Sequence, residues 1–327
     1  MKIAFAGFRH DHIFVLYEQA KNHKEYEIVG AFEDNVEARR RAEEKGIPFR
    51  YSSYKELLAD GAVETVALGG RYGDRGEMAT EALRAGKNVI SDKPLCTDVS
   101  ELDEIERLAK EKGLAVSCMF TMRFEKKIVA VKKLIESGEL GEIKNVYIGG
   151  QHPLQYGRRP EWYFEKGKHG GVINDLAVHG IDILYFFGIE PEKVNAARVW
   201  NAYADKERDF KDCGQFMLTA KNGAGVIGDV SYSVPDGAEF DLPYYWQFYV
   251  WGTKGVISFS LNEKETKYYV KGEKTPRILK EEPVGDYLTD FLKVARGDKD
   301  ADLSSDEVFL STRTTLEIQK IADKTER

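Results

Sequence analysis

The first 120 residues of this chain alternate short apolar runs with longer segments of helical periodicity. The apolar runs are bounded by turn residues and cover residues 3–6, 27–32, 65–68, 88–90 and 114–117. Helical patterns fill the intervals between them, at residues 12–22, 35–45, 74–85 and 99–112. Strands that alternate with helices pair in parallel through right-handed crossovers. We therefore expect an α/β fold in this part of the chain, with a doubly wound parallel sheet.

The pattern changes after about residue 120. A helix is predicted at residues 125–137 and two more at 284–296 and 304–324. Between them, strand-like stretches follow one another at residues 194–203, 213–221, 224–233, 244–251 and 255–261. Asn222-Gly223 and the segment 252–255 separate two pairs of these stretches and are typical of tight hairpins. Consecutive strands joined by tight turns indicate a largely antiparallel sheet.

Length and composition limit the possible classes of protein. A chain of 327 residues is long for one hydrophobic core, so we expect two domains, at residues 1–120 and 121–327. The formal charge of −7 argues against nucleic acid or an anionic membrane as the main partner. No apolar run approaches the length of a membrane span, and the glycine at position 7 comes too soon for a signal peptide. The three cysteines lack metal-ligand spacing, which favours reduced thiols in a cytoplasmic protein.

The turn after the first predicted strand reads Gly7-Phe8-Arg9-His10-Asp11-His12. In a dinucleotide-binding fold, glycines at this turn let the backbone approach pyrophosphate at a helix N-terminus. Here the first glycine is present and the other two are not, although Arg9 offers a positive charge to phosphate. The alternative is an ordinary strand-to-helix turn at Gly7.

Two acids, Glu33 and Asp34, follow the second predicted strand. An acid at this place binds the adenosine ribose hydroxyls and repels a 2′-phosphate, so the pattern favours NAD over NADP. The alternative interpretation is that both acids are solvated and simply open the next helix.

Two further segments carry the groups that a proton and hydride transfer needs. Asp92-Lys93-Pro94-Leu95 follows the fourth predicted strand, so Lys93 lies at the edge of the sheet where ligands bind. Asp175 and His179 are four residues apart on a predicted helix, with Asp182 near the same face. A neutral histidine accepts a hydroxyl proton near pH 7, and a neighbouring carboxylate orients its ring.

Simpler interpretations of these residues remain open. Lys93 has the alternative of a surface salt bridge, and the helix has the alternative of a capping Asp175 with a hydrogen-bonded interior His179. A metal site would combine Asp175 and His179 with His152 or His169, but metal-ligand spacing is absent elsewhere. We therefore expect no metal.

The order of these motifs resembles that of the Gfo/Idh/MocA family, the glucose–fructose oxidoreductase and inositol dehydrogenase group. Asp92-Lys93-Pro94-Leu95 is similar to the family's Glu-Lys-Pro-Leu, and Arg123-Phe124 to the end of its interdomain link. Residues 137–143 and the segment from Gly170-Gly171 to Asp182 also match family motifs. The resemblance implies an N-terminal Rossmann domain and a C-terminal α+β domain with a large, mostly antiparallel open sheet. That sheet commonly forms the oligomer contact, which implies a homodimer or homotetramer.

The resemblance also implies a reaction, a hydride transfer between NAD(P) and a hydroxyl carbon of a sugar, polyol or sugar derivative. Carried over by position, the catalytic residues are Lys93, Asp175 and His179. The cofactor contacts implied are Gly7, Phe8, Arg9, His10, Glu33, Gly70, Arg71, Asp92 and Lys93. The substrate neighbours implied are Arg123, Tyr156, Trp162, Asp175 and His179.

Two segments depart from the family pattern. The glycine loop is degenerate, and residues 70–75 read Gly-Arg-Tyr-Gly-Asp-Arg where the family often has Thr-Pro-Asn-x-x-His. Both segments contact cofactor in relatives. Two alternatives to a dehydrogenase therefore stay open: a lyase or glycosidase-like enzyme that uses NAD for transient oxidation, and a non-catalytic protein that binds a dinucleotide or a sugar for regulation.

Overall fold

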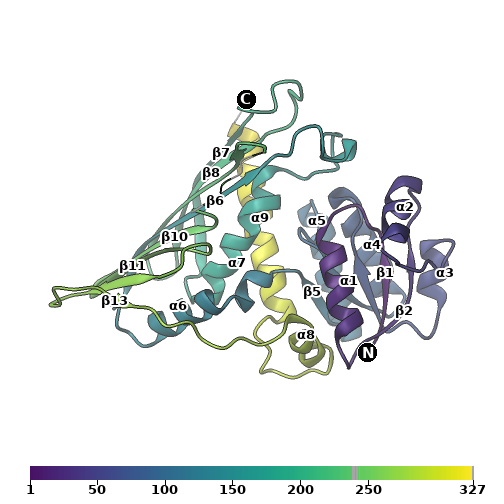
Figure 1. Ribbon diagram of the computed structural model, residues 1–327, viewed down its shortest axis with the longest axis horizontal. Coiled ribbons are helices and arrows are strands. Elements are labelled where there is room, and N and C mark those ends of the chain that lie inside the picture. Colours follow the sequence, from purple (N-terminus) through teal and green to yellow (C-terminus); the bar gives the residue numbers. More distant parts are fainter. Residues whose placement is uncertain (238–239, 241, 243, 326–327) are drawn as a thin grey trace. The chain divides into compact units, whose positions relative to one another are not determined.

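The computed structural model describes residues 1–237, 240, 242 and 244–325, and the chain divides into two compact units (Figure 1). The first unit comprises residues 1–119, 165–170 and 286–312. The second comprises residues 120–164, 171–285 and the described residues from Arg313 onward. Within the part of the chain that the structure describes, no helix has both the length and the apolar composition needed to cross a membrane.

A parallel sheet of five strands forms the centre of the first unit. Its strands are β1 (Lys2–Ala6), β2 (Glu27–Phe32), β3 (Thr65–Leu68), β4 (Asn88–Ser91) and β5 (Val116–Cys118), in the order β2-β1-β3-β4-β5. All four strand pairs are parallel, so the predicted doubly wound sheet is confirmed. Because β1 has β2 on one side and β3 on the other, the crossovers change direction at β1. Ligands of such sheets bind beyond the carboxyl ends of the strands at this reversal.

Helices connect these strands. They are α1 (His12–Asn22), α2 (Val36–Glu44), α3 (Tyr54–Ala59), α4 (Tyr72–Arg84) and α5 (Val99–Lys112). The helix α8 (Tyr287–Ala295) comes later in the chain and also belongs to the first unit. The short helix α3 was not expected from the sequence. A capping box starts α5, because the Asp98 side chain accepts from Ser100 N and the Glu101 carboxylate accepts from Asp98 N. Local sequence signals therefore set the ends of this helix.

An eight-stranded sheet dominates the second unit. Its strands are β6 (Ile143–Pro153), β7 (Pro191–Trp200), β8 (Cys213–Ala220), β9 (Gly225–Val234), β10 (Gln247–Gly252), β11 (Gly255–Ser260), β12 (Lys267–Val270) and β13 (Arg277–Ile278). The order is β13-β12-β11-β10-β6-β9-β8-β7, and all neighbours are antiparallel except β6 and β9. Both predicted hairpins are present, between β8 and β9 and between β10 and β11. The prediction of a largely antiparallel sheet is confirmed.

Helical segments cover one face of this sheet (Figure 1). They are η1 (Thr121–Phe124), α6 (Lys126–Glu136), η2 (Glu161–Tyr163), the π-helix η3 (Ile173–Ala177), α7 (Val178–Phe186) and the later part of α9 (Ser305–Thr325). Close packing sets where α7 lies, since a Cβ at Gly180 would stand 2.5 Å from Ile148 of β6. The buried core of the unit therefore lies between the helices and the inner face of the sheet.

Candidate functional site

The first and third strand-to-helix turns of the first unit are in direct backbone contact. Gly7 has φ +86°, and a Cβ there would lie 2.6 Å from the backbone nitrogen of Gly70. Arg9 N also donates to Gly69 O at 2.8 Å. Only glycine combines this conformation with so close an approach, so the single glycine retained from the fingerprint is required by the fold itself.

A hollow of about 230 Å³ opens at these turns. It lies at the carboxyl ends of β1, β2 and β3, where a doubly wound sheet binds its ligand. Five of the predicted cofactor residues line it together: Gly7, Arg9, Glu33, Gly70 and Arg71. The other lining residues are Phe32, Asp34, Tyr54, Asp74 and Met78.

The two acids after β2 have different surroundings. Glu33 is 3% exposed, and its carboxylate accepts from Phe8 N at 2.6 Å, Arg9 Nε at 2.8 Å and Asn35 N at 2.8 Å. Burial raises the pKa of Glu33, although these hydrogen bonds offset part of the effect. Asp34 is exposed and accepts from the guanidinium of Arg9 at 2.5 Å. Glu33 thus holds the first turn in shape, and Asp34 is the acid that faces solvent.

A buried hydrogen-bond network surrounds Asp92, the residue before Lys93. Asp92 Oδ2 accepts from Arg75 at 2.9 Å and lies 2.7 Å from His10 Nδ1. Arg75 is fully buried and also donates to Gly70 O at 2.9 Å and to Lys93 O at 2.6 Å. Burial by itself opposes ionisation, but the charges of Arg75 and the neighbouring histidines hold the pKa of Asp92 well below its usual value. This network joins the turns after β3 and β4 and fixes the backbone of Lys93.

The same network contains a cluster with metal-ligand chemistry. Ligand atoms of His10, His12 and Asp92 lie within 4.8 Å of one another. However, the guanidinium of Arg75 already pairs with the carboxylate, and a second cation beside it is electrostatically disfavoured. Burial lowers the pKa of His10 to about 4 despite the attraction of Asp92, so the imidazole is neutral at pH 7. We interpret the cluster as a hydrogen-bonded network.

Asp175 and His179 lie in consecutive turns of the second unit. Asp175 belongs to the π-helix η3, and His179 to the first turn of α7. The two residues therefore do not share one continuous α-helix, because a π-helical turn, which is wider than an α-helical one, carries Asp175. The ring of His179 packs edge-on against Phe120 and Trp246, with centroids 6.4 and 5.4 Å away.

Two tyrosines hold the carboxylate of Asp175. Tyr163 donates its hydroxyl to Asp175 Oδ2 at 2.9 Å, and Tyr232 donates to the same oxygen. The two phenol oxygens are 3.2 Å apart. Neither tyrosine was singled out from the sequence, because no local pattern connects them to residue 175.

The other predicted substrate neighbours are placed separately in the second unit. Arg123 is buried, and its Nε donates to both carboxylate oxygens of Asp182 at 3.0 and 2.9 Å. Trp162 is buried against Tyr163, with ring centroids 5.0 Å apart. Tyr156 is partly exposed, and its hydroxyl donates to Glu207 at 3.3 Å.

The residues predicted to contact cofactor, including Phe8, His10, Asp92 and Lys93, all belong to the first unit. Sequence reasoning did not single out Arg75, which pairs with Asp92 and donates to Lys93 O. Its signal was its position, since it replaces the histidine of the family segment that begins at residue 70.

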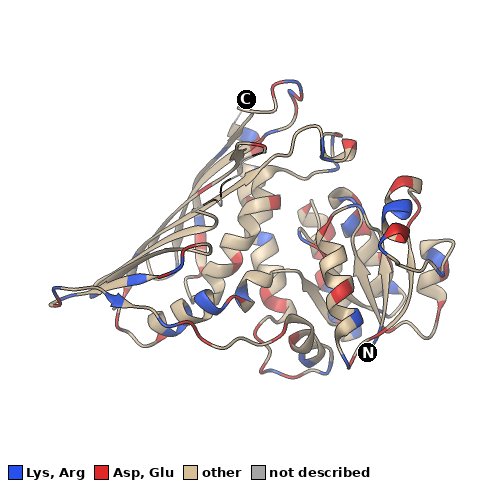
Figure 2. Ribbon diagram, in the orientation of Figure 1, with Lys and Arg blue, Asp and Glu red and all other residues tan. Residues whose placement is uncertain are grey.

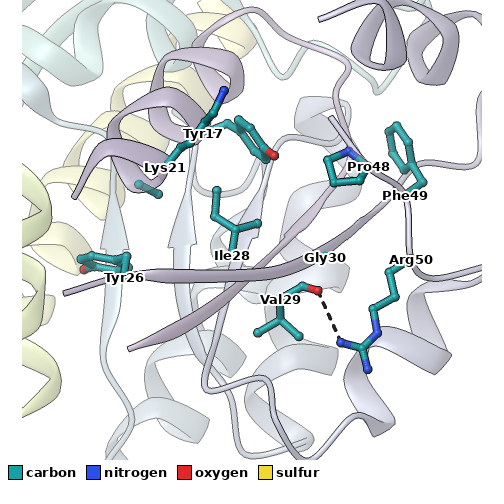
Figure 3. Close-up of a pocket in the computed structure, with 10 residues that line it drawn as sticks. Tyr17, Lys21, Tyr26, Ile28, Val29, Gly30, Pro48, Phe49 and Arg50 are labelled. Carbon is teal, nitrogen blue, oxygen red and sulfur yellow. Dashed lines mark hydrogen bonds between the residues drawn. The ribbon is translucent and has the colours of Figure 1, made fainter. Parts of the chain in front are cut away.

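A larger hollow, of about 440 Å³, lies elsewhere on the first unit (Figure 3). Its walls are the middle of β2, the end of α1 and residues 48–50, and Arg50 donates across it to Val29 O at 3.5 Å. None of its lining residues is an acid, a histidine or a cysteine, and strand ends do not form it. It therefore lacks the imidazole and carboxylate groups that the predicted proton transfer uses.

Two models of protein families match this chain. Residues 1–120 match a model described as "Oxidoreductase family, NAD-binding Rossmann fold", and residues 128–258 match "GFO/IDH/MocA C-terminal domain". A putative oxidoreductase from Erwinia carotovora atroseptica has the same fold, with a TM-score of 0.88 at 24% identity over 98% of each chain.

Two relatives with named activities match part of the chain. The trans-1,2-dihydrobenzene-1,2-diol dehydrogenase of Oryctolagus cuniculus is 30% identical over 56% of this chain and 56% of its own. The scyllo-inositol 2-dehydrogenase (NADP(+)) IolW of Bacillus subtilis is 33% identical over 52% of this chain and 46% of its own. The chain thus spans about half the length of these curated relatives.

Proposed function

We propose that this chain, which belongs to the GFO/IDH/MocA oxidoreductase family with an NAD-binding Rossmann fold, is a nicotinamide-dependent dehydrogenase of a sugar, polyol or sugar derivative. The observation that carries the proposal is the buried network that holds the backbone of Lys93 at the carboxyl end of β4. That network is joined through Gly70 O to the turns that line the 230 Å³ hollow. To polarise a substrate oxygen near a nicotinamide, a lysine has to be held in a fixed position beside the dinucleotide site.

The residues of the first unit fit a dinucleotide. The backbone at Gly7 leaves no room for a side chain. Arg9 and Arg71 line the hollow, and both are paired there with carboxylates of the same lining. We propose that Gly7, Phe8, Arg9, His10, Gly70, Arg71 and Asp92 form and support the coenzyme site. A nicotinamide coenzyme bound there would supply the acceptor for the hydride.

The proposed roles of the chain's own groups follow from their chemistry. His179 removes the hydroxyl proton of the substrate, because a neutral imidazole is a base near pH 7. Lys93 donates a hydrogen bond to the substrate oxygen, and Asp175 helps to position the hydroxyl group. The proposed substrate neighbours are Arg123, Tyr156 and Trp162, with Arg123 held in place by Asp182.

We propose NAD as the coenzyme in preference to NADP, with Asp34 as the acceptor for the ribose hydroxyls. Glu33, the acid predicted to bind ribose, is engaged by two donors of the first turn and by Asn35 N, whereas Asp34 is exposed. An exposed carboxylate repels a 2′-phosphate. Asp34→Ala should raise the KM for NAD and lower that for NADP, while an unchanged ratio would exclude Asp34 from coenzyme selection.

We also propose a homodimer or homotetramer that forms through the outer face of the eight-stranded sheet. The registers place Met217 beside Ile227, Ile227 beside Tyr147, and Tyr147 beside Tyr249. Met217, Ile227 and Trp251 are about half exposed, and the long strands carry few charged residues (Figure 2). A row of partly exposed apolar side chains that crosses several strands supports an interaction site on this face. Ile227→Lys should reduce the mass measured by light scattering, and a monomeric parent protein would overturn the proposal.

The proposed location is the cytoplasm, where thiols stay reduced. All three cysteines, Cys96, Cys118 and Cys213, are buried thiols. The proposed substrate is a small hydroxylated molecule, because the polar groups named above can bind hydroxyl groups. A nucleic acid is not expected as a partner, because the formal charge of the chain is −7.

The decisive experiment is a titration of the purified protein with NAD and NADP, followed by a panel of polyols and aldoses monitored for NADH at 340 nm. We expect dinucleotide binding and NADH formation with at least one substrate. Substrate loss without net NADH would favour the lyase or glycosidase-like enzyme that uses NAD for transient oxidation. Absence of dinucleotide binding would exclude both that enzyme and the dehydrogenase.

Lys93→Ala tests the central residue. Turnover should be abolished while the thermal melt stays close to that of the parent. Lys112→Ala is the matched control, because this lysine is exposed at the end of α5 and bonds only with the carbonyl of Arg84 among the bonds described. Full activity of Lys93→Ala would remove Lys93 from the mechanism.

A further inference from the structure

We propose that Tyr163 and Tyr232 are positioning residues that hold the Asp175 carboxylate in its working orientation. The inference rests on the proposed function, because it assigns these tyrosines a part in the same reaction. Neither tyrosine needs to touch the substrate or the coenzyme for this role.

The geometry of the three residues supports a clamp. Asp175, Tyr163 and Tyr232 are each no more than 2% exposed. They come from three separate elements: the π-helix η3, the short helix η2 and strand β9. Both phenols donate to one and the same oxygen, Asp175 Oδ2. Two donors that approach one oxygen from different elements restrict rotation of the carboxylate about its terminal bond.

The chemistry of burial explains why two hydroxyl donors are present. A carboxylate that is removed from water is costly unless hydrogen bonds replace its solvation. Hydrogen bonds from O–H groups to an ionised acceptor are about twice as strong as neutral ones. The two phenols therefore compensate for the burial of Asp175 and favour its acceptor form.

The phenol rings are themselves held by their neighbours. The guanidinium of Arg159 lies 4.7 Å from the ring centroid of Tyr163 and 6.0 Å from that of Tyr232. Phe210 stacks on Tyr232 with centroids 5.9 Å apart, and its ring is 6.2 Å from that of Tyr163. The clamp is thus a packed aromatic cluster with little rotational freedom, which is what positioning of a reacting group requires.

The π-helix contributes to the same arrangement. Gly171, which precedes η3, has φ +95°, and a Cβ there would lie 2.2 Å from the side chain of Gln319. Gln319 Oε1 accepts from Ile173 N at 2.9 Å and from Asn174 N at 3.2 Å. These contacts fix the first turn of η3, and Asp175 follows directly. π-Helical turns of this kind are frequent at functional sites.

The test removes each hydroxyl without changing the packing, in Tyr163→Phe, Tyr232→Phe and the double variant. We expect kcat to fall roughly tenfold to a hundredfold for a single variant, the effect of one hydrogen bond to a charged group. The KM for NAD should stay unchanged, because the tyrosines belong to the second unit and the proposed coenzyme residues to the first. Tyr185→Phe is the matched control, since its hydroxyl bonds with Thr314 at 2.8 Å in the same unit.

A second measurement does not depend on activity. The ¹³C signal of the Asp175 carboxyl, assigned as the signal missing in Asp175→Asn, should shift in both tyrosine variants and not in Tyr185→Phe. Unchanged kcat and unchanged signal in Tyr163→Phe and Tyr232→Phe, alongside an inactive Asp175→Asn, would overturn the clamp. A shifted signal together with full activity of Asp175→Asn would mean that the tyrosines only contact Asp175 structurally, and it would refute the proposed role of Asp175 in the reaction. The failure of the clamp and the failure of the proposed function can therefore be told apart.

Discussion

Acidification should destabilise the first unit through His10. Burial lowers the pKa of this imidazole to about 4, against about 6.5 in an unfolded chain. Between these two values the unfolded state binds a proton that the folded state excludes. The stabilisation is therefore complete above about pH 6.5 and is lost as the pH falls toward 4. At 1.36 kcal/mol per pH unit, a shift of this size corresponds to about 3 kcal/mol at pH 4.

The variant His10→Asn isolates this effect, because the asparagine amide can still donate toward Asp92 but does not titrate. Asp92 also favours high pH, yet its pKa is held well below 3.8 by Arg75 and the histidines, which outweigh its burial. Its contribution is lost only at lower pH. Replacing His10 removes one of the interactions that lower the pKa of Asp92, but the pairing of Asp92 with Arg75 stays. Other buried carboxyls titrate alike in both proteins, so the difference in unfolding free energy between parent and variant should change by about 3 kcal/mol from pH 7 to pH 4.

Urea unfolding at several pH values, followed by far-UV circular dichroism, measures this difference. Tryptophan fluorescence follows the second unit alone, because all four tryptophans, at positions 162, 200, 246 and 251, belong to it. His23→Gln controls for the loss of a histidine as such. Parallel pH dependences of parent and His10→Asn would refute the reasoning, since they would mean that His10 gains its proton at the same pH in both states.

Three further substitutions test local claims. Asn35→Ala removes the side-chain cap that accepts from Ala38 N at 2.9 Å, so unfolding by urea should show a loss of about 1 kcal/mol, and no loss would mean that α2 starts without it. Asp182→Asn leaves the buried Arg123 without its counter-charge and should cost about 3–5 kcal/mol in a thermal melt, whereas an unchanged melting temperature would show that the pair is solvated. Gly7→Ala places a Cβ 2.6 Å from the backbone nitrogen of Gly70, at a residue with positive φ. A dinucleotide titration should therefore show an affinity at least about tenfold weaker, and an affinity equal to that of the parent would contradict the close approach.

The strands that the sequence predicted are those whose residues are apolar in a continuous run or are joined by a tight turn. β6 was missed because Gly149-Gly150 and Pro153 look like breakers. It is a strand because β10 and β9 pair with it on both sides. A Cβ at Gly150 would also lie 2.6 Å from the Trp246 ring, so this glycine is needed for packing rather than for a turn.

The helical segment that carries Asp175 was also predicted only in part. Its apolar pattern predicts a helix, and a helical segment is present from Ile173 to Phe186. The same apolar pattern is compatible with an α-helical or a π-helical first turn, so the pattern does not predict which of the two forms. Contacts with Gln319, distant in sequence, hold the turn instead.

The sequence by itself determined the doubly wound sheet, the antiparallel sheet and the residue types proposed for the chemistry, Lys93, Asp175 and His179. Only the tertiary structure decided which groups hold them. Asp92 is paired with Arg75, 17 residues away, and with His10, 82 residues away. Asp175 is paired with Tyr232 across 57 residues. The physical reason is that periodicity relates residues a few positions apart, whereas the partners of a buried charge are chosen by packing between elements that local sequence does not connect.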